Sequence, residues 1–377
     1  MSLRETLSSC WRRFQDELFP WLGEAVGPLS ERHKQLVMVL DLSRVEALTP
    51  HWHGLPGRRP SERAALARAF VAKAVFQVAT TALLIDRLAA DKTLRRLCGW
   101  ERSSAVPSAS TFSRAFAEFA ASALPTRLHE ALIAATHGER LVGHISRDSL
   151  AIEAREKAVP PPPRPAAKQK RQRRRKAEGA PATAPRAIER QVNMSLEAML
   201  AELPGQCAKG VKRNAKGFKQ SWIGYKLHLD VADGGIPISA ILTAASAHDS
   251  QLAIPLATMT AARISSLYDV MDSAYDDAII RAHSRSLGHV PIIDVNPRSA
   301  RGKQERALEG QRRRILGIQL AEERRYDERT TVERVNGRIM DDFGGRTVRV
   351  RGNVKVMCHL MFGVLALTAE QLLRLVT

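Results

Sequence analysis

The chain has 377 residues, and its 58 lysines and arginines against 39 aspartates and glutamates give it a formal net charge of +19. This length predicts two domains with a sizeable core and excludes a mini-protein held together by disulfides or metal ions. The basic excess favours a polyanionic partner, either nucleic acid or an anionic lipid surface.

The four cysteines include no C-x2-C pair, so neither a zinc ribbon nor a disulfide framework is expected. The N-terminus MSLRETLSSCWRRF contains an acidic residue, Glu5, and lacks the apolar region of a signal peptide. The longest charge-free apolar runs, near 74–85 and 356–369, are shorter than the roughly 20 residues of a spanning helix. We therefore expect a soluble cytoplasmic protein that makes no membrane contact.

Residues 1–140 are rich in Ala, Leu and Arg, and between 61 and 100 apolar side chains recur at helical spacing. Ser61 is the expected cap of this helical stretch, and Gly99 is the expected stop. The sequence thus predicts an all-α N-terminal domain over residues 1–140.

Residues 91–119 predict a short helix, a turn and a second helix that Ser110 caps. The second helix would expose Thr111, Ser113 and Arg114, as the recognition helix of a DNA-binding helix-turn-helix does. The connection is longer than the usual three to four residues, so an ordinary helical hairpin is an equally good interpretation.

A proline-rich segment with nine basic residues and no acidic residue follows at 157–177. Such a composition cannot bury a core, so we expect a disordered insertion at about 156–190. Its cations, including Arg173, Arg174 and Arg175, are predicted to contact the DNA backbone; a solvated tether is the alternative.

The periodicity changes to that of strands after residue 220. Residues 225–231 alternate between apolar and polar, turn at Asp233-Gly234-Gly235 and resume from Ile236, which predicts a hairpin. Further strands are expected at 143–152, 267–272 and 289–295, and further helices at 273–288, 303–341 and 354–376. Residues 141–377 are therefore predicted to form an α/β domain, a mixed sheet flanked by helices.

Two aspartates fall where this sheet could build a site. Asp148 lies on the first strand, and Asp272 lies at the C-terminal end of an apolar strand, where open α/β sheets place their ligands. A half-buried aspartate there is costly unless it is paired or coordinates a cation. Helix capping is the alternative for Asp272, although Ser273 could serve as the cap equally well.

The third candidate is Glu333, in the helical stretch YDERTTVERVNGRIMDDF. Thr330 and Glu333 fit a capping box, in which the glutamate only binds the cap amide. In the alternative, an uninterrupted helix places Glu333 with Arg329 and Asn336 on the flank of an apolar stripe, where Arg329 can pair with Glu333 and keep it ionised.

At these residues the chain resembles bacterial insertion-sequence transposases of the DDE type. YDERTTVE matches the Y-x2-R-x3-E signature of that group, and ISRDSLAIEA and VMDSAYDD are similar to its two aspartate segments. RGNVKVMCHLMFGVLALTAEQLLRL is similar to the closing helix and PSASTFSRAF to the N-terminal region, so the resemblance spans residues 31 to 376. Motifs in this order are more specific than any one of them.

The resemblance implies an RNase H-like catalytic domain in which Asp148, Asp272 and Glu333 hold two Mg²⁺ ions, with Mn²⁺ as a substitute. It implies cleavage and strand transfer of double-stranded DNA, at terminal inverted repeats and at a target, by a homodimer in the bacterial nucleoid. Tyr326 and Arg329 of the signature would contact DNA. The group's Lys or Arg seven residues after the glutamate is Met340 here, so Arg338 is the expected phosphate contact.

Two alternatives stay open: a DNA-binding protein without catalysis, either a decayed transposase or a regulator, and an RNase H-like nuclease that cuts without joining. Five other groups of residues favour structural roles over a metal or DNA site. The histidine groups have no third ligand at a recognisable spacing, the aspartate pair fits a solvated first helical turn, and the aromatic residues fit strand-edge packing. They are His51 with His53, His248 with Asp249, Asp276 with Asp277, Trp222 and Tyr225.

Overall fold

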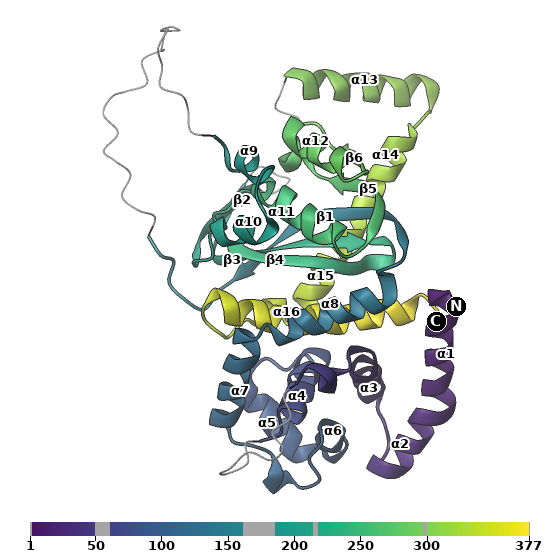
Figure 1. The fold of residues 1–377 in the computed structure, drawn as a ribbon, viewed down its shortest axis with the longest axis vertical. Helices are drawn as coiled ribbons and strands as arrows, with labels where there is room; N and C mark the ends of the chain where they lie inside the picture. The colour runs from purple at the N-terminus through teal and green to yellow at the C-terminus, as the bar shows by residue number, and fades with distance from the viewer. Residues whose placement is uncertain (1, 50–60, 161–184, 214–217, 297–299, 377) are drawn as a thin grey trace.

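The structure is a computed structural model that describes residues 2–49, 61–160, 185–213, 218–296 and 300–376 (Figure 1). A sheet of six strands lies at its centre. The strands are β1 (Leu141–Glu153), β2 (Ala208–Arg213), β3 (Lys219–Ala232), β4 (Ile236–Ala244), β5 (Ser265–Met271) and β6 (Val290–Ile293).

The sheet is mixed. The strand β3 pairs antiparallel with β1, β2 and β4, whereas β5 runs parallel to β1 and β6 runs parallel to β5. The predicted hairpin is confirmed, with its turn at Asp233–Gly235, and β1 occupies the middle of the sheet between β3 and β5. The neighbouring strand β3 also has strands on both sides and is covered on both faces of the sheet. Its successive residues Leu229 and Asp230, which point to opposite faces, are therefore both buried.

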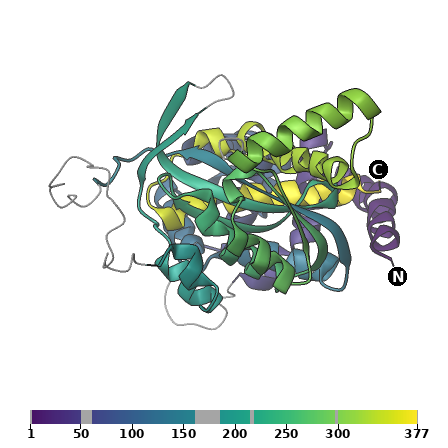
Figure 2. The ribbon, with the colours of Figure 1, turned by 90° about the horizontal axis from the view of Figure 1, so that it is seen from above.

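Helices cover both faces of the sheet (Figures 1 and 2). On one side α11 packs on β3 and β4 and α12 packs on β6, while α15 and α16 lie on the other side, against β1, β3 and β4. These helices, with those that flank them, are α9 (Ala187–Gln191), α10 (Leu196–Glu202), α11 (Ala253–Ala261), α12 (Ala278–Ser286), α13 (Ala300–Leu316), α14 (Ala321–Tyr326), α15 (Thr330–Asp341) and α16 (Asn353–Arg374). The predicted RNase H-like architecture, a mixed sheet flanked by helices, is confirmed.

The residues before β1 are helical wherever the structure describes them, apart from turns. The helices are α1 (Leu3–Arg13), α2 (Phe19–Val26), α3 (Glu31–Ser43), α4 (Arg63–Val75), α5 (Thr81–Ala90), α6 (Lys92–Cys98), α7 (Ala109–Ala121) and α8 (Leu124–His137). Gly99 ends α6 with φ 107°, as expected for a glycine stop.

The two predicted caps in this region are wrong. The residue before α4 is Glu62, which makes no side-chain cap, so Ser61 lies outside the helix end. The residue before α7 is Ser108, and the helix begins at Ala109, two residues before the start at Thr111 that a Ser110 cap would give. Caps depend on where the chain turns into the helix, and several serines in one loop make that point ambiguous in a sequence.

The C-terminal helix α16 joins the sheet to the N-terminal helices. It packs on β4 and also on α3, α4, α7 and α8, and the Phe362 ring stacks on Phe70 with centroids 5.8 Å apart. Among the described residues α16 alone has the length and apolarity of a membrane span, but 78% of its apolar window is buried in the fold. One core therefore runs across the predicted boundary at residue 140.

The structure bears on the cysteines and on the C-terminal limit of the predicted insertion. Within the described residues, Cys10, Cys98, Cys207 and Cys358 are all free, as expected. The predicted disordered insertion extends too far toward the C-terminus, because α9 begins at Ala187. Residues 161–184, which include Arg173, Arg174 and Arg175, lie outside the described residues, as do His51 and His53.

Candidate active site

The register of the parallel strands brings the two candidate aspartates together. Arg147 on β1 is paired with Met271 on β5, so Asp148 and Asp272 are the next residues on two adjacent strands. Side chains alternate along a strand, so Asp148 points to the face opposite that of Arg147. That face is covered by α15, the helix that carries Glu333.

Asp148 is largely buried and contacts α15 directly. The side-chain amide of Asn336 donates a hydrogen bond to Asp148 Oδ2 at 3.2 Å, and Asn336 Oδ1 is buried with no hydrogen-bond partner in the described structure. Burial raises the pKa of Asp148 to about 6, although the Ser149 amide and the positive charges of Arg329 and Lys212 act in the opposite direction. Asp148 therefore carries an incompletely compensated negative charge at neutral pH.

Asp272 caps the short turn that follows β5. Its Oδ1 accepts a hydrogen bond from the Ala274 amide at 2.9 Å, so Asp272, and not Ser273, is the cap. Its Oδ2 lies 3.9 Å from Nη2 of Arg329. Burial raises the pKa of Asp272, and the Arg329 charge lowers it. Capping thus occupies one oxygen of Asp272 and leaves the other facing the site.

Glu333 does not form the capping box. The backbone of Arg329 before α15 is already helical, with φ −57° and ψ −27°, and no side chain caps the helix. The Thr330 hydroxyl donates to the carbonyl of Asp327 at 2.9 Å, whereas Glu333 Oε1 accepts from Arg329 Nη1 at 2.5 Å. The helix continues from the preceding turns, so the amide that a capping glutamate would bind is not at a helix start. The predicted pairing of Arg329 with Glu333 is confirmed.

Arg329 is the cation that the three acids share. It contacts Glu333 and Asp272 and also interacts electrostatically with Asp148. Tyr326, one turn earlier, is half-buried; burial raises the pKa of its hydroxyl to about 12, and the Arg329 charge acts in the opposite direction. Of the two signature residues, the arginine contacts the acids directly.

The acid groups are hard oxygen donors of the kind that Mg²⁺ prefers. Among the described residues Asp272 Oδ2 and Glu333 Oε2 accept no hydrogen bond, and half of the Glu333 side chain is exposed. No three acidic, histidine or cysteine side chains of the described part are grouped closely enough to hold an ion as they stand. The donor set fits a divalent ion, and binding one requires Arg329 and the carboxylates to rearrange.

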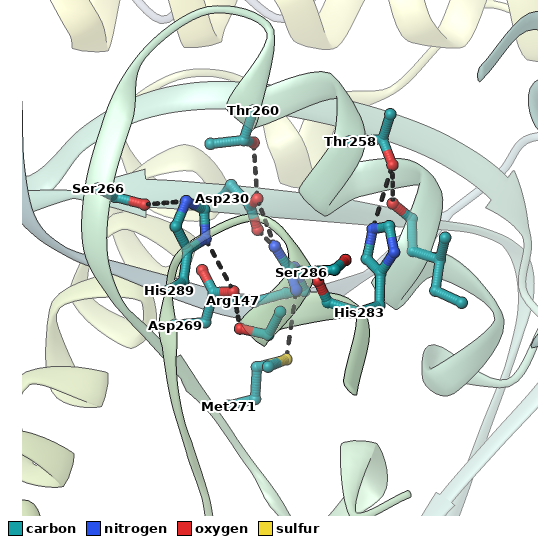
Figure 3. A network of polar contacts seen from close by, with 12 residues as sticks. Arg147, Asp230, Thr258, Thr260, Ser266, Asp269, Met271, His283, Ser286 and His289 are labelled. Carbon is teal, nitrogen blue, oxygen red and sulfur yellow. Dashed lines mark hydrogen bonds and ion pairs between the residues drawn. The ribbon is translucent and has the colours of Figure 1, made fainter. Parts of the chain in front are cut away.

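The opposite face of the same strands carries a buried polar network (Figure 3). Arg147 donates two hydrogen bonds of 2.7 Å to Asp230 on β3, and Thr260 on α11 donates to the same carboxylate at 2.6 Å. Although burial alone would lower it, the pKa of Arg147 is raised by Asp230. On β5, Asp269 accepts hydrogen bonds from Ser284 and His289.

This network links β1 to β3 and, through a 3.2 Å contact of Arg147 with the Met271 sulfur, to β5. A buried ion pair tolerates little displacement, because either charge left alone would be strongly destabilised. The network therefore fixes the strand register that places Asp148 beside Asp272.

The remaining predicted DNA contacts lie in different places. Arg338 donates hydrogen bonds to Glu370 on α16 at 2.9 and 3.0 Å and to Asp342 at 3.1 Å, and it lies away from the acids. Met340 packs against the core, so neither residue brings a cation to the acid group. Arg114 is exposed on the first half of α7.

The candidates expected to be structural are explained by local contacts. Asp277 caps α12, and Asp276 accepts from Arg281 at 3.1 Å. Tyr225 is buried, and its hydroxyl donates to Glu156 at 2.6 Å. Asp249 is held by Lys226 at 3.0 Å.

Sequence reasoning did not find the contact between Asn336 and Asp148 or the electrostatic influence of Lys212. The helical spacing placed Asn336 on the flank with Glu333, which was a usable signal. Lys212 lies on β2, a short basic strand that the sequence analysis did not predict, and nothing in the local pattern connects it with the acids.

Two family models match the chain. Residues 194–369 match the model described as "Transposase DDE domain", and residues 24–118 match the model described as "Transposase domain (DUF772)". No curated protein and no solved structure matches. The first match includes Asp272 and Glu333 but begins after β1, so the position of Asp148 in the site rests on the sheet register. Enzymes of this family use divalent metal ions and act on DNA. The chain belongs to the DDE transposases of insertion sequences.

Proposed function

We propose that the chain binds the terminal inverted repeats of its own element, cleaves the DNA there and joins the freed 3′ hydroxyl to target DNA, with Asp148, Asp272 and Glu333 as the catalytic residues. The observation that carries the proposal is the convergence of Asp148, Asp272 and Glu333 around Arg329. The alignment of Asp148 and Asp272 on neighbouring strands supports it.

The carboxylates would hold two Mg²⁺ ions, for which Mn²⁺ can substitute. When bound, such a pair activates the attacking oxygen and stabilises the leaving oxygen of a phosphodiester. Asn336 orients Asp148 through its amide, and its buried Oδ1 can accept a hydrogen bond from a water molecule or hydroxyl at the site. Burial of Asp148 makes its negative charge costly, so the apo site favours a cation.

Arg329 and Tyr326 would contact the phosphate backbone at the cleaved end. In the absence of DNA the Arg329 guanidinium neutralises the acids, and a bound divalent ion would free it to pair with a phosphate. Arg114, Arg173, Arg174 and Arg175 would add backbone contacts outside the site. Two DNA ends must meet for strand transfer, so we expect a homodimer on DNA.

The test uses a plasmid carrying the inverted repeats that bracket the gene, with Mg²⁺ and the full chain. Cleavage at the repeat ends followed by covalent joining to a target plasmid is expected. Cleavage without joining would instead identify a nuclease. Binding without either reaction, at any Mg²⁺ or Mn²⁺ concentration, would overturn the proposal.

One observation favours a second candidate, a DNA-binding protein without catalysis. The signature lysine or arginine is replaced by Met340, which is partly buried and packs against the core, and Arg338 is held by Glu370. The variant Met340→Lys, which restores the signature cation, distinguishes an active transposase from a DNA-binding protein without catalysis. A gain of cleavage in that variant together with an inert parent would mark a decayed transposase.

A further inference from the structure

A basic hollow lies outside the acid site, where three segments of the chain meet. Its volume is about 430 Å³, and it is lined by Ser113 and Phe116 of α7, by Arg155 just after β1 and by residues 349–351 and Lys355 around the start of α16. In Figure 1 this is where the first turns of α16 pass α7. We propose that this basic hollow binds a phosphate of duplex DNA, an inference that rests on the proposed function.

The charge of the hollow is one-sided. Arg155, Arg349, Arg351 and Lys355 are all exposed, and none of the described carboxylates lines the hollow. None of these four side chains forms an ion pair within the described residues, and the like charges repel one another. A polyanion relieves that repulsion, whereas nothing in the described fold does.

Glu156, the residue after Arg155, is already engaged. Its Oε1 accepts hydrogen bonds from the Tyr225 hydroxyl at 2.6 Å and from the Gly352 amide at 3.1 Å. The neighbouring Arg351 Nε donates to the carbonyl of Arg155 at 3.1 Å, which ties the segment before α16 to the end of β1. The cations are thus held on a fixed backbone and remain available to an external anion.

The start of α16 adds to the field of the hollow. This 22-residue helix begins at Asn353 with no side-chain cap and no acidic residue in its first turn. The first amides of a helix and its dipole favour a negative charge at this end. The planar guanidinium groups of the arginines can each donate two hydrogen bonds to phosphate oxygens. The helix start and these arginines together define an anion site that suits a phosphodiester.

The location of the hollow favours duplex DNA over another anion. Arg155 follows Asp148 by seven residues along and just beyond β1. That separation is roughly 20 Å for an extended chain, or about six base pairs of duplex. A DNA end at Asp148 can therefore reach the hollow, and the exposed Ser113 and Arg114 extend the same surface along α7.

The test measures binding of the full chain to a labelled random-sequence duplex by fluorescence anisotropy over a range of salt concentrations. Arg349→Ala/Lys355→Ala should lower affinity roughly tenfold and reduce the slope of log K against log salt by about one unit for each cation removed. The charge-preserving Arg349→Lys/Lys355→Arg should retain the slope. Arg285→Ala, an exposed arginine on α12, should match the parent.

A double alanine variant with the parent's affinity and slope overturns the basic hollow as a DNA site. If Asp272→Asn abolishes cleavage in that case, the hollow alone is rejected and the proposed function stands. If the parent never cleaves its own repeats but the double alanine variant binds more weakly, the proposed function fails and the basic hollow remains a DNA site.

Discussion

Arg329 Nη1 lies 2.5 Å from Glu333 Oε1, one helical turn further along the chain. The same guanidinium faces Asp272 at 3.9 Å, so one cation links the late helix to the end of β5. Its position explains how the acids coexist in the apo protein: their mutual repulsion is offset by a positive charge that metal ions can replace.

Replacing Arg329 should move the pH dependence of cleavage. Its charge lowers the pKa of both Asp148 and Asp272, so Arg329→Met should raise these pKa values and shift the rising limb of the rate profile by roughly one pH unit to higher pH. Arg334→Met on the same helix is the control, because Arg334 donates its hydrogen bond to Thr331, at 3.1 Å, and forms no ion pair with an acid of the described residues. A lower cleavage rate with an unchanged pH dependence would mean that Arg329 contacts DNA without changing the pKa values of Asp148 and Asp272.

Asn336 should act as a positioning residue. Asn336→Ala removes the amide that holds Asp148, and we expect a cleavage rate 10- to 100-fold lower with a higher Mg²⁺ requirement. The measurement is the cleavage rate as a function of Mg²⁺ concentration. Asn193→Ala, at an exposed asparagine after α9, should behave as the parent. An unchanged Mg²⁺ requirement in a folded Asn336→Ala protein would reject the positioning role.

Asp148 should make the apo protein less stable as the pH rises. Its pKa is about 6 in the fold against 3.8 for the free side chain, so the folded state binds more protons between these values. Stability therefore falls from about pH 4 to about pH 6, by roughly 2 to 3 kcal/mol at neutral pH. Urea denaturation with EDTA should show Asp148→Asn to be more stable than the parent at pH 7, and the gain should shrink toward pH 4.

Other carboxylates titrate in both proteins, so the difference between them isolates Asp148. Asp16→Asn, at an exposed aspartate, is the matched control and should show no such pH-dependent gain. A stability difference for Asp148→Asn that is the same at pH 4 and pH 7 would show that Asp148 is not a buried, destabilised charge.

The ion pair beneath the site should show strong coupling. Arg147→Met alone leaves Asp230 buried and unpaired and should cost about 3 to 5 kcal/mol of unfolding free energy. Arg147→Met with Asp230→Leu should be far less destabilising than the sum of the single changes. The exposed pair of Arg346 and Asp341 is the control and should show almost no coupling. Additive effects at Arg147 and Asp230 would contradict a register-fixing role.

Much of this fold follows from local sequence patterns. Alternation and a Gly-Gly turn predicted the hairpin of β3 and β4, and the short apolar run ending at Asp272 predicted β5. The strand expected at 143–152 is β1, although its apolar alternation is poor. These signals suffice because burial and pleating act residue by residue. The strand pairing then aligned the two aspartates, which no local pattern could establish.

The helix caps that the sequence left open or assigned wrongly have a common physical origin. The capping box at Thr330 was wrong because a cap requires an extended residue before the helix, and here the chain arrives already helical from η7 (Asp327–Arg329). For the turn after β5 the sequence left Asp272 and Ser273 as equally good caps, and Asp272 is the one that caps it. In both cases the backbone conformation of neighbouring residues decided the outcome, and tertiary packing sets that conformation.

The most direct test of the site is cleavage of the element's repeat ends by Asp272→Asn under conditions where DNA binding is measured in the same tube. The account predicts that this variant binds DNA with the parent's affinity and folds normally but cleaves at least about a thousandfold more slowly in Mg²⁺ and Mn²⁺. Asp276→Asn, four residues along, should cleave at close to the parent's rate. An Asp272→Asn protein that cleaves as fast as the parent would contradict the central claim.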